Sequence, residues 1–215
     1  MSPIHQLPTH HPGGDLLARH AAGTLDDGPA LVVATHLDFC PLCRRRAQGL
    51  EALGGALLDT LPPAAMAPDA LERTLEKLAG ETGTASVPDA DPTLPATLRH
   101  RHLGPWRLVA PGIRGRAVRV DPRQGYKVML FRVKPGMAIP LHGHRGLEYT
   151  CVIQGAFSDS LGRFGPGDMV ELDAGVDHEP TVGRQDGDCL CLIAVRGRLR
   201  IHGLLGRLVQ PLVGL

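Results

Sequence analysis

Apolar residues recur at spacings of three and four through residues 15–80, which predicts a series of short helices. The first is expected from Asp15 to Ala22, with Gly23 after it as a stop signal. A second is expected to open at Pro29 and run through ALVVATHLDF. A third should begin at Pro41, because the first position of a helix tolerates proline best.

The third and fourth expected helices carry narrow leucine stripes. The stripe of the third contains Leu50, Leu53, Leu57 and Leu61 and is interrupted by two glycines, Gly54 and Gly55. The fourth helix, PDALERTLEKLAG, ends at Gly80 and places its leucines at 71, 75 and 78. Such narrow stripes suit docking on a partner better than building a large core.

A stretch with few apolar residues follows the expected helices, and beyond it the hydrophobic period changes from that of helices to that of strands. Residues 82–96, TGTASVPDADPTLPA, have the composition of a linker. Beyond it, short β-like runs are separated by Gly, Pro and Asp, as in an antiparallel barrel or jelly roll: WRLVA, RAVRV, YKVMLFRV, EYTCVIQG, DMVEL and CLCLIAV. The chain is therefore predicted to hold a small all-α domain (1–81), a linker (82–96) and an all-β domain (97–215).

Composition and charge indicate the expected location of the protein and exclude some classes of partner. No apolar run approaches the roughly 20 residues of a membrane span, and the N-terminal segment has no signal-peptide pattern. We therefore expect a cytoplasmic protein whose five cysteines are ligands, redox groups or core residues. Residues 1–90 carry a net charge of −5 and the remainder +6. The arginines are scattered, so we expect neither nucleic acid nor membrane as a direct partner.

The stretch THLDFCPLC concentrates metal-ligand chemistry in the helical half. His36 and Cys40 are one helical turn apart, and Cys43 would lie in the first turn of the next helix. This spacing is typical of structural zinc sites, whose fourth ligand would come from the upstream histidines His5, His10, His11 and His20. The alternative is a helix-capping histidine beside two small core residues.

A second group of potential ligands lies in the β half. His142 and His144 would share one face of a strand, Glu148 follows four residues later, and His178 follows a turn. Three imidazoles and a carboxylate suit a divalent transition metal with open positions, such as Zn, Fe, Mn, Ni or Co. The alternative is a barrel that has lost its metal and retains these residues as filling.

The other three cysteines are expected to be buried, Cys189 and Cys191 inside the barrel. Cys189 and Cys191 alternate with leucine and should point to one face, as buried small residues or as a redox-sensitive pair near the metal. Cys151 is expected in the core.

Together these motifs resemble a known family. HxxxCxxC in a short N-terminal helical domain is similar to the zinc-binding anti-sigma factors, and LLARHAAGTL, LVVATHL and CPLCRRRA resemble the ChrR-type subgroup, which joins that domain to a cupin. The cupin signature matches from Gly136 to Gly155 and again from Gly167 to His178, except that Asp173 replaces a proline. The resemblance assigns the fourth zinc ligand to His11 by position, with His10 as the alternative.

The resemblance implies an anti-sigma factor. The helical domain would bind zinc and sequester an extracytoplasmic-function sigma factor. The cupin, with a divalent metal for which zinc is favoured, would sense singlet oxygen or organic hydroperoxides and trigger release. The rival class is a metal-dependent cupin enzyme, such as a dioxygenase or isomerase, and a third is a metal or redox sensor with another partner. The appended helical domain favours the anti-sigma factor over the enzyme.

Overall fold

The computed structural model describes residues 7–80, 91–197 and 199–201, without the side chains of His144 and residues 199–201. The described chain contains five α-helices and a short 3-10 helix (Pro122–Gln124); the α-helices are α1 (Gly14–Ala21), α2 (Asp27–Phe39), α3 (Pro41–Asp59), α4 (Ala70–Gly80) and α5 (Ala96–Arg99). The expectation that the second helix opens at Pro29 is wrong by two residues. Pro29 is the third helical residue, where the missing N–H removes no intrahelical bond.

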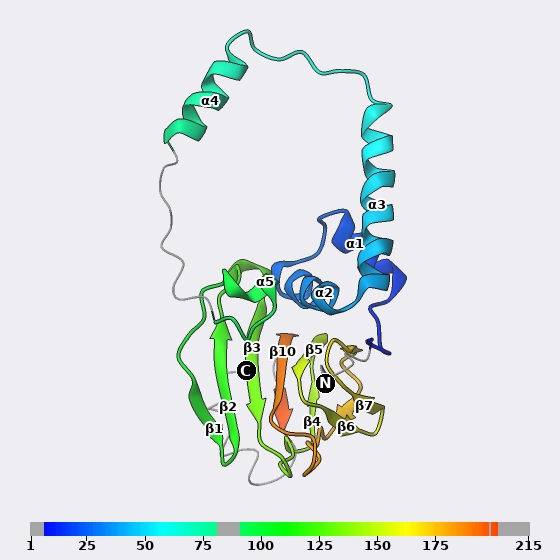
Figure 1. The fold of residues 1–215 in the computed structure, drawn as a ribbon, viewed down its shortest axis with the longest axis vertical. Helices are drawn as coiled ribbons and strands as arrows, with labels where there is room; N and C mark the ends of the chain where they lie inside the picture. Colours follow the sequence, from blue (N-terminus) through cyan, green and yellow to red (C-terminus); the bar gives the residue numbers. More distant parts are fainter. Residues whose placement is uncertain (1–6, 81–90, 198, 202–215) are drawn as a thin grey trace, which may run out of the picture.

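The six expected apolar runs form one antiparallel sheet in the described chain (Figure 1). Its order is β1 (Arg107–Ala110), β2 (Ile113–Val118), β3 (Tyr126–Val133), β10 (Cys189–Arg196), β5 (Glu148–Gln154) and β8 (Met169–Leu172). A second sheet contains β11 (Leu199–Ile201), β4 (His142–His144) and β9 (Asp177–His178), and β6 (Phe157–Asp159) pairs with β7 (Gly162–Phe164). The helical region followed by an antiparallel cupin-like domain confirms the predicted fold class.

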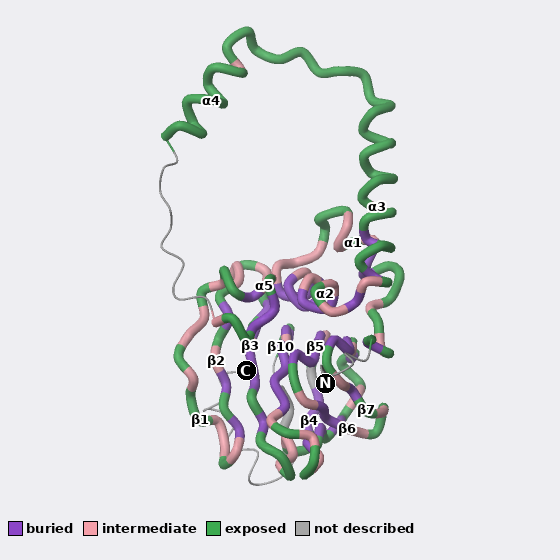
Figure 2. The backbone as a smooth tube through the Cα atoms, viewed as in Figure 1, coloured by how far each residue is buried: buried purple, intermediate pink, exposed green. Residues whose placement is uncertain are grey.

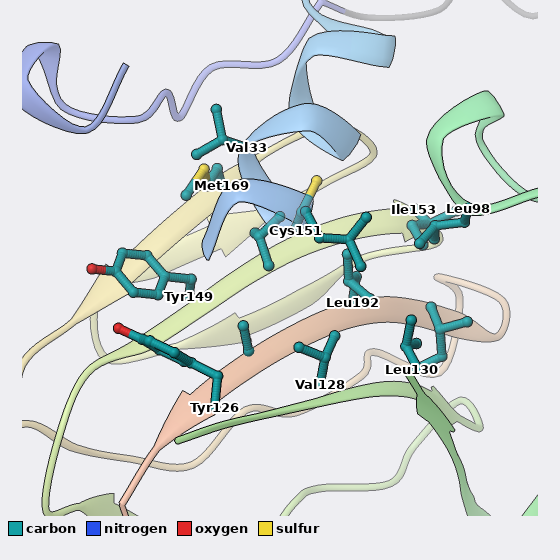
Figure 3. Packing of buried hydrophobic residues seen from close by; sticks show 14 of the residues in the cluster. Val33, Leu98, Tyr126, Val128, Leu130, Tyr149, Cys151, Ile153, Met169 and Leu192 are labelled. Carbon is teal, nitrogen blue, oxygen red and sulfur yellow. The ribbon is translucent and has the colours of Figure 1, made fainter. Parts of the chain in front are cut away.

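The central strands of the large sheet, β5 and β10, are buried on both faces. One face turns into the barrel, where a core cluster includes Phe131, Val152 and Phe157. The other face is covered by α2 and α5, and its cluster joins residues of both helices to the sheet. Figure 3 shows Val33 of α2 near Cys151 and Met169, and all three belong to that one cluster. The helical and β regions therefore share a hydrophobic core.

The outer helices are exposed by contrast. In α3 the buried residues are Cys43 and Ala47, both near its first turns, although the helix continues through the glycine pair at 54 and 55. In α4, which the structure describes in full, no residue is buried. Figure 2 shows the far part of α3 and nearly all of α4 as exposed chain extending away from the body of the protein.

Most of the expected linker, residues 82–90, lies outside the described residues. Its described end contains Leu94, which is buried in the core that α2 and the sheet share. None of the described helices combines the length and apolar character needed to cross a membrane.

Candidate metal centres

The joint between α2 and α3 gathers four potential metal ligands. His11 precedes α1, His36 lies in the last turn of α2, Cys40 separates the two helices, and Cys43 lies in the first turn of α3. One ligand atom from each residue lies within 4.8 Å of the ligand atoms of the other three. The structure thus brings together the complete set expected from the sequence.

The local fold explains why the two thiols meet. Cys40 has extended backbone angles (φ −106°, ψ 99°), so it ends α2 and serves as the N-cap of α3. Its Sγ accepts a hydrogen bond from the backbone N–H of Cys43 at 3.4 Å. Pro41 occupies the first turn, where its missing N–H removes no helical bond. Cap geometry therefore turns both sulfur atoms to the same side.

The two imidazoles complete the group. His11 Nδ1 lies 3.5 Å from the Sγ of Cys40 and 3.5 Å from that of Cys43. His36 Nδ1 lies 2.6 Å from the carbonyl oxygen of Gly167, which fixes the ring. His36 Nε2 is buried and has no hydrogen-bond partner among the described residues. A buried nitrogen of this kind requires an explanation, and a metal ion held by these four residues provides one.

The protonation of the group also fits metal binding. Burial lowers the pKa of His36, which keeps its imidazole neutral as a ligand must be. Burial, followed by the hydrogen bond with Cys40, raises the pKa of Cys43 to about 11. A bound cation would stabilise the thiolates and release their protons.

His10 has a different neighbour. Its Nδ1 lies 3.4 Å from Oδ2 of Asp168, and its ring packs against Phe164 with centroids 4.5 Å apart. Of the two upstream histidines that the sequence left open, the structure places His11 in the ligand group and His10 beside the cupin.

The barrel interior holds a second group. His142 and His178 are directly paired residues of β4 and β9, and their Nε2 atoms are 3.1 Å apart. Glu148 begins β5, and its Oε1 lies 4.0 Å from His178 Nε2. Ligand atoms of these three buried residues lie within 4.8 Å of one another. His144 shares β4 with His142, but its side chain lies outside the described part of the chain.

The imidazoles of His142 and His178 are both oriented by a hydrogen bond at Nδ1. His142 Nδ1 lies 2.8 Å from the carbonyl oxygen of Pro140, and His178 Nδ1 lies 3.1 Å from Oδ2 of Asp159. A hydrogen bond at Nδ1 fixes the tautomer and leaves Nε2 to bind a metal. Asp159 was not anticipated from the sequence. A carboxylate in the strand before the Gly167–His178 motif was a weak signal, because acidic residues near turns are common.

The space beside these ligands is small. It has a volume of about 30 Å³ and a largely apolar lining that includes Phe157 and Val182. Glu148 is held there by a hydrogen bond to its Oε1 from Thr150 Oγ1 at 3.0 Å. Such a volume admits a ligand about the size of a water molecule, whereas sites for organic ligands have roughly 300–1,000 Å³.

Cys189 and Cys191 line the same space. Their Sγ atoms are 3.7 Å apart and both residues are buried. The hydrogen bond with Cys189, with burial, raises the pKa of Cys191 well above its usual value, so it stays a protonated thiol. Cys151 faces the opposite core, as expected.

A family model, a known protein and a solved structure are similar to this chain. Residues 96–197 match the model of the ChrR cupin-like domain. The chain is 40% identical to the anti-sigma-E factor ChrR of Cereibacter sphaeroides over 209 residues, 94% of this chain and 96% of that protein. It is also similar to a crystal structure of Rhodobacter sphaeroides SigE in complex with the anti-sigma ChrR. That match has 38% identity and a TM-score of 0.72, and covers 87% of this chain and 99% of the other.

Proposed function

The chain belongs to the family of ChrR anti-sigma factors, and on that premise we propose that it sequesters an extracytoplasmic-function sigma factor and releases it under oxidative stress. The support for the partner is the relative solved in complex with SigE. A sigma factor works with RNA polymerase, so a chain that binds one would be located in the cytoplasm.

The observation that carries the sigma-binding proposal is the exposed apolar surface of the outer helices. Seven leucines are each more than half exposed: Leu53, Leu57, Leu58 and Leu61 in or just after α3, and Leu71, Leu75 and Leu78 in α4. Positions 71, 75 and 78 share one face of α4. An exposed leucine face is the feature that an amphipathic helix lays into the groove of a partner.

The proposed zinc at His11, His36, Cys40 and Cys43 would serve this surface. Two thiolates and two imidazoles are the donor set of a closed, tetrahedral structural zinc site. With zinc bound, the start of α3 is tied to α2 and to the segment before α1. The metal would therefore fix the direction in which α3 presents its leucines, without taking part in any reaction.

The proposed sensor is the metal of the cupin, held by His142, His144, Glu148 and His178, for which we favour zinc. The limited space beside these residues fits singlet oxygen or the terminal O–O group of an organic hydroperoxide better than it fits a whole organic substrate. Reaction of the oxidant at the intact metal site would change the packing of β4, β5 and β9 and so favour a state with lower affinity for sigma. The enzyme alternative gains no support from this cavity.

Charge substitutions on the two faces of α4 test sigma binding. Leu75→Glu places a carboxylate in the exposed leucine face, and Lys77→Gln changes net charge by the same amount away from that face. Binding of the purified cognate sigma factor, measured by titration calorimetry, should weaken at least about tenfold for Leu75→Glu, since a desolvated charge costs more than 1.4 kcal/mol. Lys77→Gln should bind as the wild type does. Equal affinities for all three proteins would refute the proposed surface.

A further inference from the structure

The N-terminal ligand group rests directly on a turn of the cupin. Residues 165–168 form this supporting turn, which leads into β8. Gly167 offers its carbonyl to His36, and the carboxylate of Asp168 holds the segment that carries His11. We infer that the cupin supplies the outer coordination sphere of the N-terminal metal and that Asp168 is its main positioning residue. This inference rests on the metal proposed at that site.

Asp168 organises the chain just before His11. Its Oδ1 accepts hydrogen bonds from the backbone N–H of Thr9 at 2.6 Å and of His10 at 2.8 Å. The backbone N–H of Met169 donates to the carbonyl of His10 at 3.1 Å. The backbone N–H groups of residues 9 and 10 and the carbonyl of His10 are thus all hydrogen-bonded to the cupin. These bonds fix the position of the next residue, His11, beside the two thiols.

The carboxylate is itself built into the turn. Oδ2 of Asp168 accepts from the backbone N–H of Gly165 at 2.8 Å, and the residue is 5% exposed. These hydrogen bonds outweigh burial, which alone would raise the pKa, and hold the pKa of Asp168 below its usual value. A buried carboxylate with this many fixed donors has few other conformations available.

Gly167 brings the turn close enough to reach His36. Its φ is +85°, and a Cβ there would lie 2.6 Å from both Phe39 Cβ and Pro8 Cγ. Both neighbours belong to the helical region. Contact of bare backbone with α2 is therefore a requirement of the site, since any side chain at 167 would push the carbonyl away from His36.

The supporting turn is also bonded to the strand that carries a cupin ligand. The N–H of Gly167 donates to the carbonyl of Val152 at 2.8 Å, and the N–H of Val152 donates to the carbonyl of Asp168 at 3.0 Å. Val152 lies four residues after Glu148 on β5, roughly 13 Å along the strand. A single strand thus connects the two ligand groups, and a shift of β5 at Glu148 would reach the support of His11 and His36.

Metal release from the full-length protein tests this inference. Cobalt(II) bound to thiolates has a near-ultraviolet charge-transfer band that a histidine and carboxylate site lacks, so this band reports the N-terminal site alone. After excess EDTA is added, the band should decay about ten times faster in Asp168→Ala than in the wild type, the lower end of the effect of outer-sphere ligands. Asp173→Ala, at the other end of β8 and exposed, is the matched control and should decay like the wild type.

A conservative variant guards against misfolding. Asp168→Asn keeps one oxygen to accept from residues 9 and 10 and loses the one that accepts from Gly165, so its decay should be more than twofold faster than that of the wild type and slower than that of Asp168→Ala. If Asp168→Ala fails to fold, Asp168→Asn decides: a decay within twofold of the wild type overturns the inference. The same result for a folded Asp168→Ala overturns it too. Absence of the thiolate band from the wild type would instead refute the proposed N-terminal metal site.

Discussion

Helix α2 and the pair formed by α3 and α4 come from one helical region, yet they differ in what they bury. Seven of the thirteen residues of α2 are buried, whereas α4, described in full, has no buried residue. Both regions are rich in apolar side chains. The difference is that α2 contacts the sheet while the ends of α3 and α4 extend away from it (Figures 1 and 2).

The two parts of the helical region therefore have different roles. Apolar residues of α2 are used within the chain, because they complete the second face of the sheet. Those of α3 and α4 remain available to a partner. The four ligands His11, His36, Cys40 and Cys43 lie at the boundary, since Cys40 ends one helix and caps the next.

The largest expected effect comes from removing the metal at this boundary. Cys43→Ala should lose the N-terminal metal, keep the cupin metal, and bind the sigma factor about 100-fold more weakly, because α3 is no longer fixed to α2. Metal analysis and titration with the sigma factor measure both effects. Cys151→Ala, outside both ligand groups, is the control and should keep two metals per chain. Two metals retained in Cys43→Ala would contradict the assignment.

Next in size is the effect of removing a cupin ligand on the release of the sigma factor. His142→Ala should bind the sigma factor with nearly wild-type affinity, because α3 and α4 are untouched. Its release under singlet oxygen or an organic hydroperoxide should be weakened or lost, since the cupin metal site is incomplete. Recovery of free sigma from the complex after oxidant treatment gives the measurement. His102→Ala, an exposed histidine outside both groups, should release normally; normal release by His142→Ala would reject the sensor.

The difference in burial between α2 and α4 can be tested by measuring the free energy of unfolding. Leu31 is 1% exposed in the core between α2 and the sheet, and Leu75 is 55% exposed on α4. Leu31→Ala should lower the free energy of unfolding by about 2–5 kcal/mol, and Leu75→Ala by less than about 0.5 kcal/mol. Urea denaturation followed by circular dichroism separates them. A similar loss for both variants would show that the two regions are not distinct in this way.

A small effect is expected at the other end of α2. Oδ2 of Asp27 accepts from the N–H of Asp121 at 3.3 Å and lies 3.8 Å from Arg101, at the edge of the interface. Because both charged side chains are more than a third exposed, Asp27→Asn should cost only about 0.2–1 kcal/mol. A loss above about 2 kcal/mol in the same urea experiment would show that this end holds α2 as firmly as the metal end does.

The sequence predicts strands where burial is greatest. All six apolar runs became strands of the large sheet, and β5 reads as a continuous run because both of its faces are covered. Hydrophobic periodicity did not indicate the strands β4, β6, β7, β9 and β11, since each has only two or three residues. They include the strands of His142 and His178, which motif spacing identified where periodicity could not.

Contacts between distant segments account for what the sequence could not predict. The roles of Gly167 and Asp168 depend on the N-terminal segment and α2 meeting the cupin, and neither residue shows this locally. One signal was available: the run ALVV of α2 is apolar on several sides, which is typical of a helix covered all round. The choice between His10 and His11 likewise required the position of Asp168.

Because the central strands of the sheet are covered on both faces, the ways in which such chains can diversify are limited. A cupin transferred without α2 would expose the leucine, valine and tyrosine side chains of β3, β5 and β10, an apolar area that promotes aggregation. Recombination between relatives should therefore give soluble chimeras when two crossovers, one after α2 and one before the barrel, exchange only α3 and α4, so that α2 and the barrel come from one parent. A single crossover between α2 and the barrel would join two surfaces that were never selected together.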